Sequence, residues 1–282
     1  MTSGYFWYHS DDRVFYQKGK KSITKLLKLL IISAIGYTIV NIVLCTTRAE
    51  IREYLYLFIK PTTWIKFLAM NDTDIFAVQL WFIPASIYGY VFWMLARRMK
   101  FEKVCYGFIP ILLLFGTLVK YMLTGTQIDT WHLGGNWIFR SIPYMGTGLL
   151  LSRYSNICSK FNRKFLIVLT IVGCVMQSVP KPEYWMINPM ILATYVYSVG
   201  VFLIATNEHY HVCGEFEKLG EIGRTCATTV YLIHIAIYKI LSRVILELEF
   251  TIDVNLMPII VAIVSLTIAM VKNKMAVYKK YQ

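Results

Sequence analysis

The chain of 282 residues is 57% hydrophobic and only 16% charged, whereas soluble domains carry about 25% charged residues. This composition excludes a soluble enzyme and indicates a protein that lies in a lipid bilayer. The net charge of +13 would also suit nucleic-acid binding, but the basic residues flank apolar segments, as in membrane proteins, so we expect no nucleic-acid partner. The six cysteines form no Cys-x-x-Cys pair of the kind that marks a zinc or redox site.

Apolar stretches recur along the chain, separated by charged residues, and most are long enough to cross the roughly 30 Å of a bilayer core. They predict an all-α fold, a polytopic transmembrane helix bundle of about eight spans. The spans are expected at Leu26 to Leu44, Ile75 to Leu95, Val104 to Leu123, Trp137 to Leu151, Phe165 to Val179, Ile187 to Thr206, Thr225 to Ser242 and Leu256 to Val271. The fourth and fifth are short, and such stretches also occur as re-entrant or buried core segments.

The stretch between the first two spans differs from the others. Pro61 interrupts the residues from Glu50 to Met70, which favours an interfacial or re-entrant segment over a further crossing. We expect residues 1–282 to form a single membrane domain. It would have a basic cytoplasmic segment at 1–25, the transmembrane bundle at 26–271 and a cytoplasmic tail at 272–282.

The orientation follows from the basic residues. Most of the 29 lysines and arginines fall on alternate connecting segments, on the side where the chain begins. Positively charged segments stay in the cytoplasm. Because eight spans return the chain to its starting side, we expect both termini in the cytoplasm and the protein in the cell (plasma) membrane.

The span from Thr225 to Ser242 carries a polar stripe. At about 100° per residue, one side of this helix collects Arg224, Thr228, Tyr231, His234, Tyr238 and Ser242, whereas Ile233 points elsewhere. Similar rows are Ser33, Tyr37 and Asn41 in the first span, and Asn188, Thr194, Tyr195 and Ser198 in the sixth. Such side chains either line a hydrated interior or form interhelical hydrogen bonds. An imidazole at this depth favours a functional role, so His234 is the candidate general base.

Two further groups are candidate site residues. Arg140 lies near the outer end of the fourth expected span, where its guanidinium either reaches the interface or faces an anionic group in a cavity. His209, His211 and Cys213 offer three possible zinc ligands without a fourth. We therefore expect no metal site and no bound cofactor.

Four short motifs follow one another over nearly the whole chain. They are Met1 to Phe6, Leu80 to Ala85, Asn136 to Gly148, and Leu219 to His234 with its Tyr-Leu-x-His ending. In this order they resemble motifs of the membrane acyltransferase 3 family. Its bacterial members O-acylate cell-envelope sugars, and the membrane domains of the vancomycin-resistance serine racemases belong with them.

The resemblance implies a ten-helix bundle that takes an acyl group, expected to be acetyl, from cytoplasmic acyl-CoA. The acceptor would be an extracytoplasmic cell-envelope carbohydrate or a similar small molecule. The family's Arg-x-x-Arg pair corresponds to Lys25 and Lys28, which we expect to meet the CoA phosphates. His234 would be catalytic, and Tyr231, Tyr238 and Arg140 would line the substrate path.

Two departures from the family pattern leave other interpretations open. The family's first two helices, which carry an essential Arg and His, have no counterpart, so an N-terminally truncated chain is expected. Lys25 and Lys28 keep the charge of the arginine pair but lose its bidentate geometry. The alternatives are a non-catalytic transporter or export subunit for a polysaccharide or small amino acid, and a remnant of a longer gene.

Overall fold

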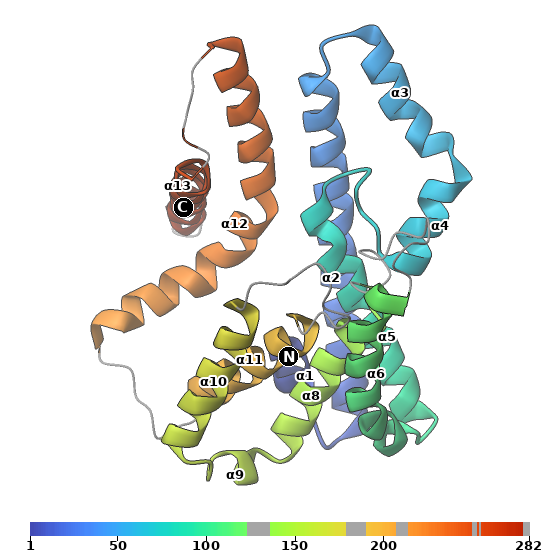
Figure 1. Cartoon of the computed structure of the whole chain (residues 1–282), viewed down its shortest axis with the longest axis vertical. Helices are drawn as coiled ribbons and strands as arrows, with labels where there is room; N and C mark the ends of the chain where they lie inside the picture. The colour runs from blue at the N-terminus through green and yellow to red at the C-terminus, as the bar shows by residue number, and fades with distance from the viewer. Residues whose placement is uncertain (123–135, 179–189, 207–213, 250–252, 254, 279–282) are drawn as a thin grey trace. The chain divides into compact units, whose positions relative to one another are not determined.

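A computed structural model describes residues 1–122, 136–178, 190–206, 214–249, 253 and 255–278. This part of the chain consists of helices and their connections, without strands (Figure 1). It divides into two compact units. The first comprises Met1–Leu30, Ile65–Asp72 and Trp81–His211, and the second comprises Ile31–Trp64, Thr73–Leu80 and Val212–Gln282. Each unit is described by itself.

The first unit is built around α8 (Ser141–Arg153), which contacts α1 (Thr2–Trp7), α5 (Phe82–Arg98) and α6 (Glu102–Met122). Beside this group, α10 (Arg163–Ser178) pairs with α11 (Met190–Thr206), and the short α9 (Ser155–Cys158) follows α8. The fully buried Phe15, Trp93 and Leu149 lie in one apolar cluster contributed by α2 (Asp12–Leu44), α5 and α8. Aromatic rings such as those of Phe15 and Trp93 bury a large apolar area each.

The first residues, within the segment 1–25 that is expected to be cytoplasmic, are folded. They form α1, in which Trp7 is buried and stacks on Phe15 with ring centroids 4.2 Å apart. The backbones of α1 and α8 approach so closely that a Cβ atom at Gly4 or Gly148 would collide with the backbone of the other helix. Small residues permit such close helix packing. This segment therefore belongs to the folded core of the first unit.

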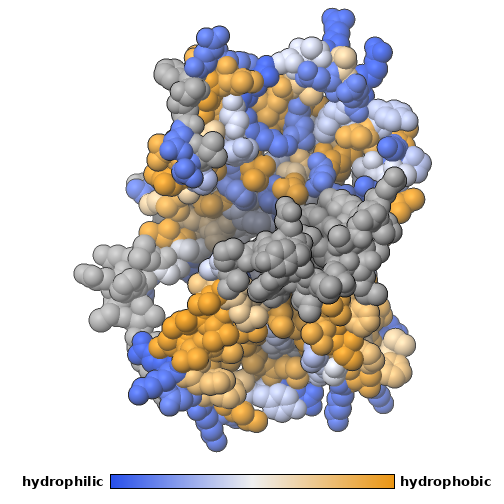
Figure 2. All heavy atoms as spheres, in the orientation of Figure 1, coloured by the Kyte–Doolittle hydropathy of each residue, from blue (hydrophilic) through white to orange (hydrophobic). Residues whose placement is uncertain are grey.

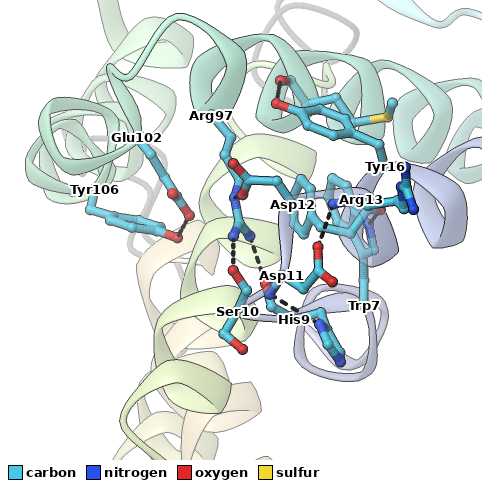
Figure 3. A network of polar contacts seen from close by, with 12 residues as sticks. Trp7, His9, Ser10, Asp11, Asp12, Arg13, Tyr16, Arg97, Glu102 and Tyr106 are labelled. Atoms are coloured by element: carbon cyan, nitrogen blue, oxygen red, sulfur yellow. Dashed lines mark hydrogen bonds and ion pairs between the residues drawn. The ribbon is translucent and has the colours of Figure 1, made fainter.

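Arg97, near the end of α5, fixes the connection between α1 and α2 (Asp12–Leu44), as Figure 3 shows. Its guanidinium donates to the carboxylate of Asp12 at 2.7 Å and to the carbonyls of His9 and Ser10 at 2.8 and 2.9 Å. It also lies 4.3 Å from the centre of the Phe15 ring. The planar fork of an arginine can serve several acceptors at once. Sequence reasoning had treated Arg97 only as one of the charges that set orientation.

The second unit contains the C-terminal part of α2, α3 (Arg48–Ile59), the start of the 3₁₀ helix Val78–Trp81, α12 (Gly214–Glu247) and α13 (Met257–Tyr278). In it α12 packs against α13. The next helix, α4 (Pro61–Met70), begins at the proline that was expected to interrupt this region. Proline is favourable in the first turn of a helix, where no partner for its missing N–H is needed.

The start of α3 is capped by reciprocal hydrogen bonds. Thr47 Oγ1 accepts from the backbone N–H of Glu50 at 3.2 Å, and the Glu50 carboxylate accepts from Thr46 N and Oγ1 at 2.8 and 2.9 Å. These bonds from Thr46 to the charged carboxylate lower the pKa of Glu50. Since two free N–H groups at the helix start are satisfied, α3 begins sharply at Arg48.

The chain is a multi-pass membrane protein, with five described helices long and apolar enough to cross a bilayer. These are Asp12–Leu44, Val78–Arg98, Glu102–Val119, Gly220–Glu247 and Met257–Met275. The expected number of eight is not confirmed, because α8, α10 and α11 have only 13, 16 and 17 residues. At 1.5 Å per residue α8 is roughly 20 Å long, less than a bilayer core. Hydrophobic side chains cover wide areas of the face shown in Figure 2.

The boundaries of the expected spans also shift. The first span lies within α2, a continuous helix of 33 residues that begins at Asp12. The second was expected from Ile75, but α5 begins at Phe82 after a turn and the 3₁₀ helix. Pro84 is compatible with this start, because it lies in the first turn of α5, where its missing N–H would have no partner within the helix. Residues 187–189 of the sixth expected span lie outside the described part.

Candidate functional site

In the second unit the polar row of α2 meets residues of α12 and of the connection before α5. The Tyr37 hydroxyl donates to the Leu232 carbonyl at 2.6 Å and accepts from the side-chain amide of Gln79. The Tyr231 hydroxyl donates to the Gln79 carbonyl. Tyr37 and Gln79 are 4% and 9% exposed, so this is a buried polar network. Sequence reasoning missed Gln79, because it lies in no periodic pattern.

A second polar chain lies further along the same helices. The Lys239 ammonium donates to Asn41 Oδ1 at 2.7 Å. The Asn41 amide donates to the Phe76 carbonyl at 2.9 Å and to the Tyr54 hydroxyl at 3.2 Å, and that hydroxyl donates to the Ile75 carbonyl at 2.9 Å. Asn41 belonged to the predicted row in the first span, whereas the role of Lys239 as its partner was not predicted.

His234 is held by its own helix. Its Nδ1 lies 3.1 Å from the Val230 carbonyl oxygen and 2.9 Å from that of Tyr231. Carbonyl oxygens only accept, so these contacts assign the hydrogen of the neutral ring to Nδ1 and leave the lone pair on Nε2. Among the described residues, none donates a hydrogen bond to that nitrogen. The imidazole is therefore oriented as a proton acceptor.

His234 lines a cavity of about 620 Å³ between α12 and α13. Tyr231 and Tyr238 lie beside it on α12, with the Tyr231 ring centroid 6.3 Å from that of the imidazole. The walls are mostly apolar, and α13 contributes Pro258, Val261, Ala262 and Leu266. Three of the predicted site residues thus meet at one cavity that is large enough for a substrate.

The rest of the predicted stripe does not extend this cavity. Arg224 is exposed and pairs with Glu221 at 3.6 Å, and neither Thr228 nor Ser242 lines it. The side chains of the stripe spread over a wide arc of α12, so they do not all face the same neighbour. His234 and Tyr238 lie on the part of the helix that faces α13, whereas the Tyr231 hydroxyl reaches Gln79.

Arg140 lines a cavity of about 200 Å³ in the first unit, directly before α8. Its guanidinium carbon lies 5.7 Å from the centre of the Trp81 ring. Thr194, one of the polar row in the sixth expected span, lines the same cavity, whereas the Tyr195 hydroxyl bonds to Thr147. Arg140 therefore lines a small cavity. The sequence had left open whether its guanidinium reaches the membrane interface or faces an anionic group in a cavity.

Lys25 and Lys28 lie on α2 within the first unit, and both are exposed. Residues three apart share one face of a helix, so the two ammonium groups can act on one ligand. Neither lines a cavity described above. The described residues contain no group of three potential metal ligands, while His209, His211 and Cys213 lie outside the described residues.

Comparison with known proteins identifies one family. The family model described as acyltransferase domain, that of the acyltransferase 3 family, matches residues 1–273. No match was found among curated proteins or among solved structures.

Proposed function

Because this chain belongs to the acyltransferase 3 family, we propose that it transfers an acyl group, acetyl in the first instance, from cytoplasmic acyl-CoA to a hydroxyl of an extracytoplasmic cell-envelope carbohydrate or similar acceptor. The observation that supports the proposal is the His234 imidazole, which lines the cavity between α12 and α13 and whose Nδ1 contacts leave Nε2 as the proton acceptor.

The proposed reaction needs one base at the acceptor hydroxyl. His234 Nε2 takes the hydroxyl proton while the oxygen bonds to the carbonyl carbon of the thioester. The carbon–sulfur bond then breaks, and the CoA thiolate leaves with the proton from the imidazolium. A positioned imidazole contributes about 10² to 10⁴-fold to such steps. Protons and electrons balance without a metal or a redox cofactor.

The other predicted residues have supporting roles in this proposal. Tyr231 and Tyr238 line the path to His234, and Arg140 lines the substrate path in the first unit. Lys25 and Lys28 meet the CoA phosphates, which bind well to point charges on the cytoplasmic side. The chain would act as a single membrane domain in the plasma membrane, surrounded by lipid.

The test measures release of CoA thiol by the full chain reconstituted in lipid nanodiscs, with acetyl-CoA and with or without soluble cell-envelope polysaccharide. We expect His234→Ala to abolish acceptor-dependent release at unchanged melting temperature. Ile233→Ala is the matched control, because its side chain does not line the cavity. Equal losses in both variants would refute a chemical role for His234. Uptake of the sugar by proteoliposomes without consumption of acetyl-CoA would instead support the transporter interpretation.

The proposed orientation is tested separately. A reporter fused after Lys164 should report the cytoplasm, and one fused after Gln127 should report the outside, since basic segments stay inside. A cytoplasmic signal at Gln127 would contradict both the orientation and the expected span count.

A further inference from the structure

Arg140 has the one charged side chain among the described residues that line the cavity beside it. The other lining residues come from α1 and Met1 before it, from Trp81 and α5, and from α8 and α11, and Arg140 contributes its guanidinium from the turn before α8. The Nε atom of Arg140 is buried and has no hydrogen-bond partner in the part of the chain that the structure describes. The Trp81 ring covers one side of the guanidinium.

Arg140 is partly buried, and the Nε edge of its guanidinium is the part that lacks a partner among the described residues. No described carboxylate lies within ion-pair distance of Arg140, although Arg97, Arg224 and Arg243 each have one. Burying a charge without a partner is costly, and the ring face of Trp81 compensates only in part. The unpartnered Nε–H of Arg140 is suited to an anionic ligand in the cavity.

The walls define the chemical class of that ligand. A single guanidinium balances a monoanion, and its Nε edge matches the two oxygens of a carboxylate. Hydroxyls of Ser86, Ser141 and Tyr144 line the cavity. The Ser141 hydroxyl lies 3.6 Å from the Met145 sulfur, a weak acceptor, so its hydrogen can turn to a carboxylate oxygen.

We propose that this cavity binds a short monocarboxylate such as acetate or propionate, with the carboxylate on Arg140. The apolar part of the lining, which includes Trp81, Phe82 and Met145, receives the short hydrocarbon chain. A cavity of about 150 Å³ can hold benzene, so the volume of about 200 Å³ at Arg140 restricts the ligand to a small molecule. This assignment does not require the acyl transfer proposed for His234.

Binding is measured by equilibrium dialysis of radiolabelled acetate against the full chain in nanodiscs, without acyl-CoA. Arg140→Gln should weaken binding about tenfold or more, since it removes a charged hydrogen-bond donor. Arg140→Lys should recover only part of the affinity, because it lacks the fork. Arg153→Gln is the matched control, as this exposed arginine at the other end of α8 also lies over a ring, that of Tyr154. His234→Ala should bind acetate normally, which separates failure of this proposal from failure of the proposed reaction.

Several results would overturn the assignment. Acetamide has the shape of acetate without the charge, and equal binding of acetamide would exclude recognition by the guanidinium. Unchanged acetate binding in Arg140→Gln would place the ligand elsewhere. Tighter binding of chloride or phosphate than of acetate would show a general anion site. Tighter binding of glucuronate would show that the carboxylate belongs to a larger ligand.

Discussion

Replacing Arg97 by alanine should destabilise the first unit by about 2 to 4 kcal/mol. The ion pair with Asp12 contributes little of this, because the carboxylate is 69% exposed while the Arg97 side chain is 12% exposed. The larger part comes from the bonds to the carbonyls of His9 and Ser10 and from the guanidinium on the Phe15 ring. These contacts tie α1 to α2 where the chain turns.

The assay is equilibrium unfolding of the detergent-solubilised chain, followed by tryptophan fluorescence, since Trp7 stacks in the same cluster. Asp12→Asn should cost less than about 1 kcal/mol. Arg97→Lys should fall between Asp12→Asn and Arg97→Ala, because one ammonium cannot serve three acceptors in a fork. Arg153→Ala is the control for loss of an exposed arginine. A change below about 0.5 kcal/mol for Arg97→Ala, or wild-type stability for Arg97→Lys, would refute this account of the connection.

Gly148→Ala should lower the melting temperature, because the new Cβ atom would collide with the backbone of α1. The control Gly107→Ala should leave the melting temperature equal or higher, since nothing lies within 4 Å of its Cβ position and alanine favours a helix. Asn41→Leu should destabilise the chain by about 2 to 4 kcal/mol in chemical unfolding, because it leaves Lys239 without the amide it donates to. Wild-type stability of Asn41→Leu would contradict the pairing. Tyr37→Phe should cost about 1 to 2 kcal/mol in the same assay, as a buried hydroxyl with two partners is lost.

Hydropathy predicted where most helices lie because that signal is local. The apolar residues of α6 and α13 fill nearly the whole expected spans at Val104 to Leu123 and Leu256 to Val271. Hydropathy does not predict as well which helices are long enough to cross. The helix α8 begins only at Ser141 and has 13 residues, although the apolar residues Trp137 to Phe139 precede it. The packing of α1 could not be predicted, because it depends on a close approach between residues far apart in the chain.

Helical periodicity also predicted part of the candidate site. It placed Tyr231, His234 and Tyr238 on one side of α12, and they do line one cavity. Periodicity describes one helix, however, and does not show which neighbour each residue meets. Gln79 was missed because it lies in a short 3₁₀ helix before α5. Arg97 was missed because the orientation of the chain already explained its charge.

The polar residues of the second unit fall into two classes once their partners are known. Backbone outside a helix leaves carbonyls that need donors, and in the segment Thr73–Leu80 these are supplied by the side chains of Asn41, Tyr54 and Tyr231. These three side chains therefore hold an irregular connection in place. His234 differs, because its only described bonds are to its own helix, and they fix the ring without using Nε2. Hydrogen bonding to another segment thus explains Tyr231 but does not explain His234, and this difference makes the imidazole the residue to test for chemistry.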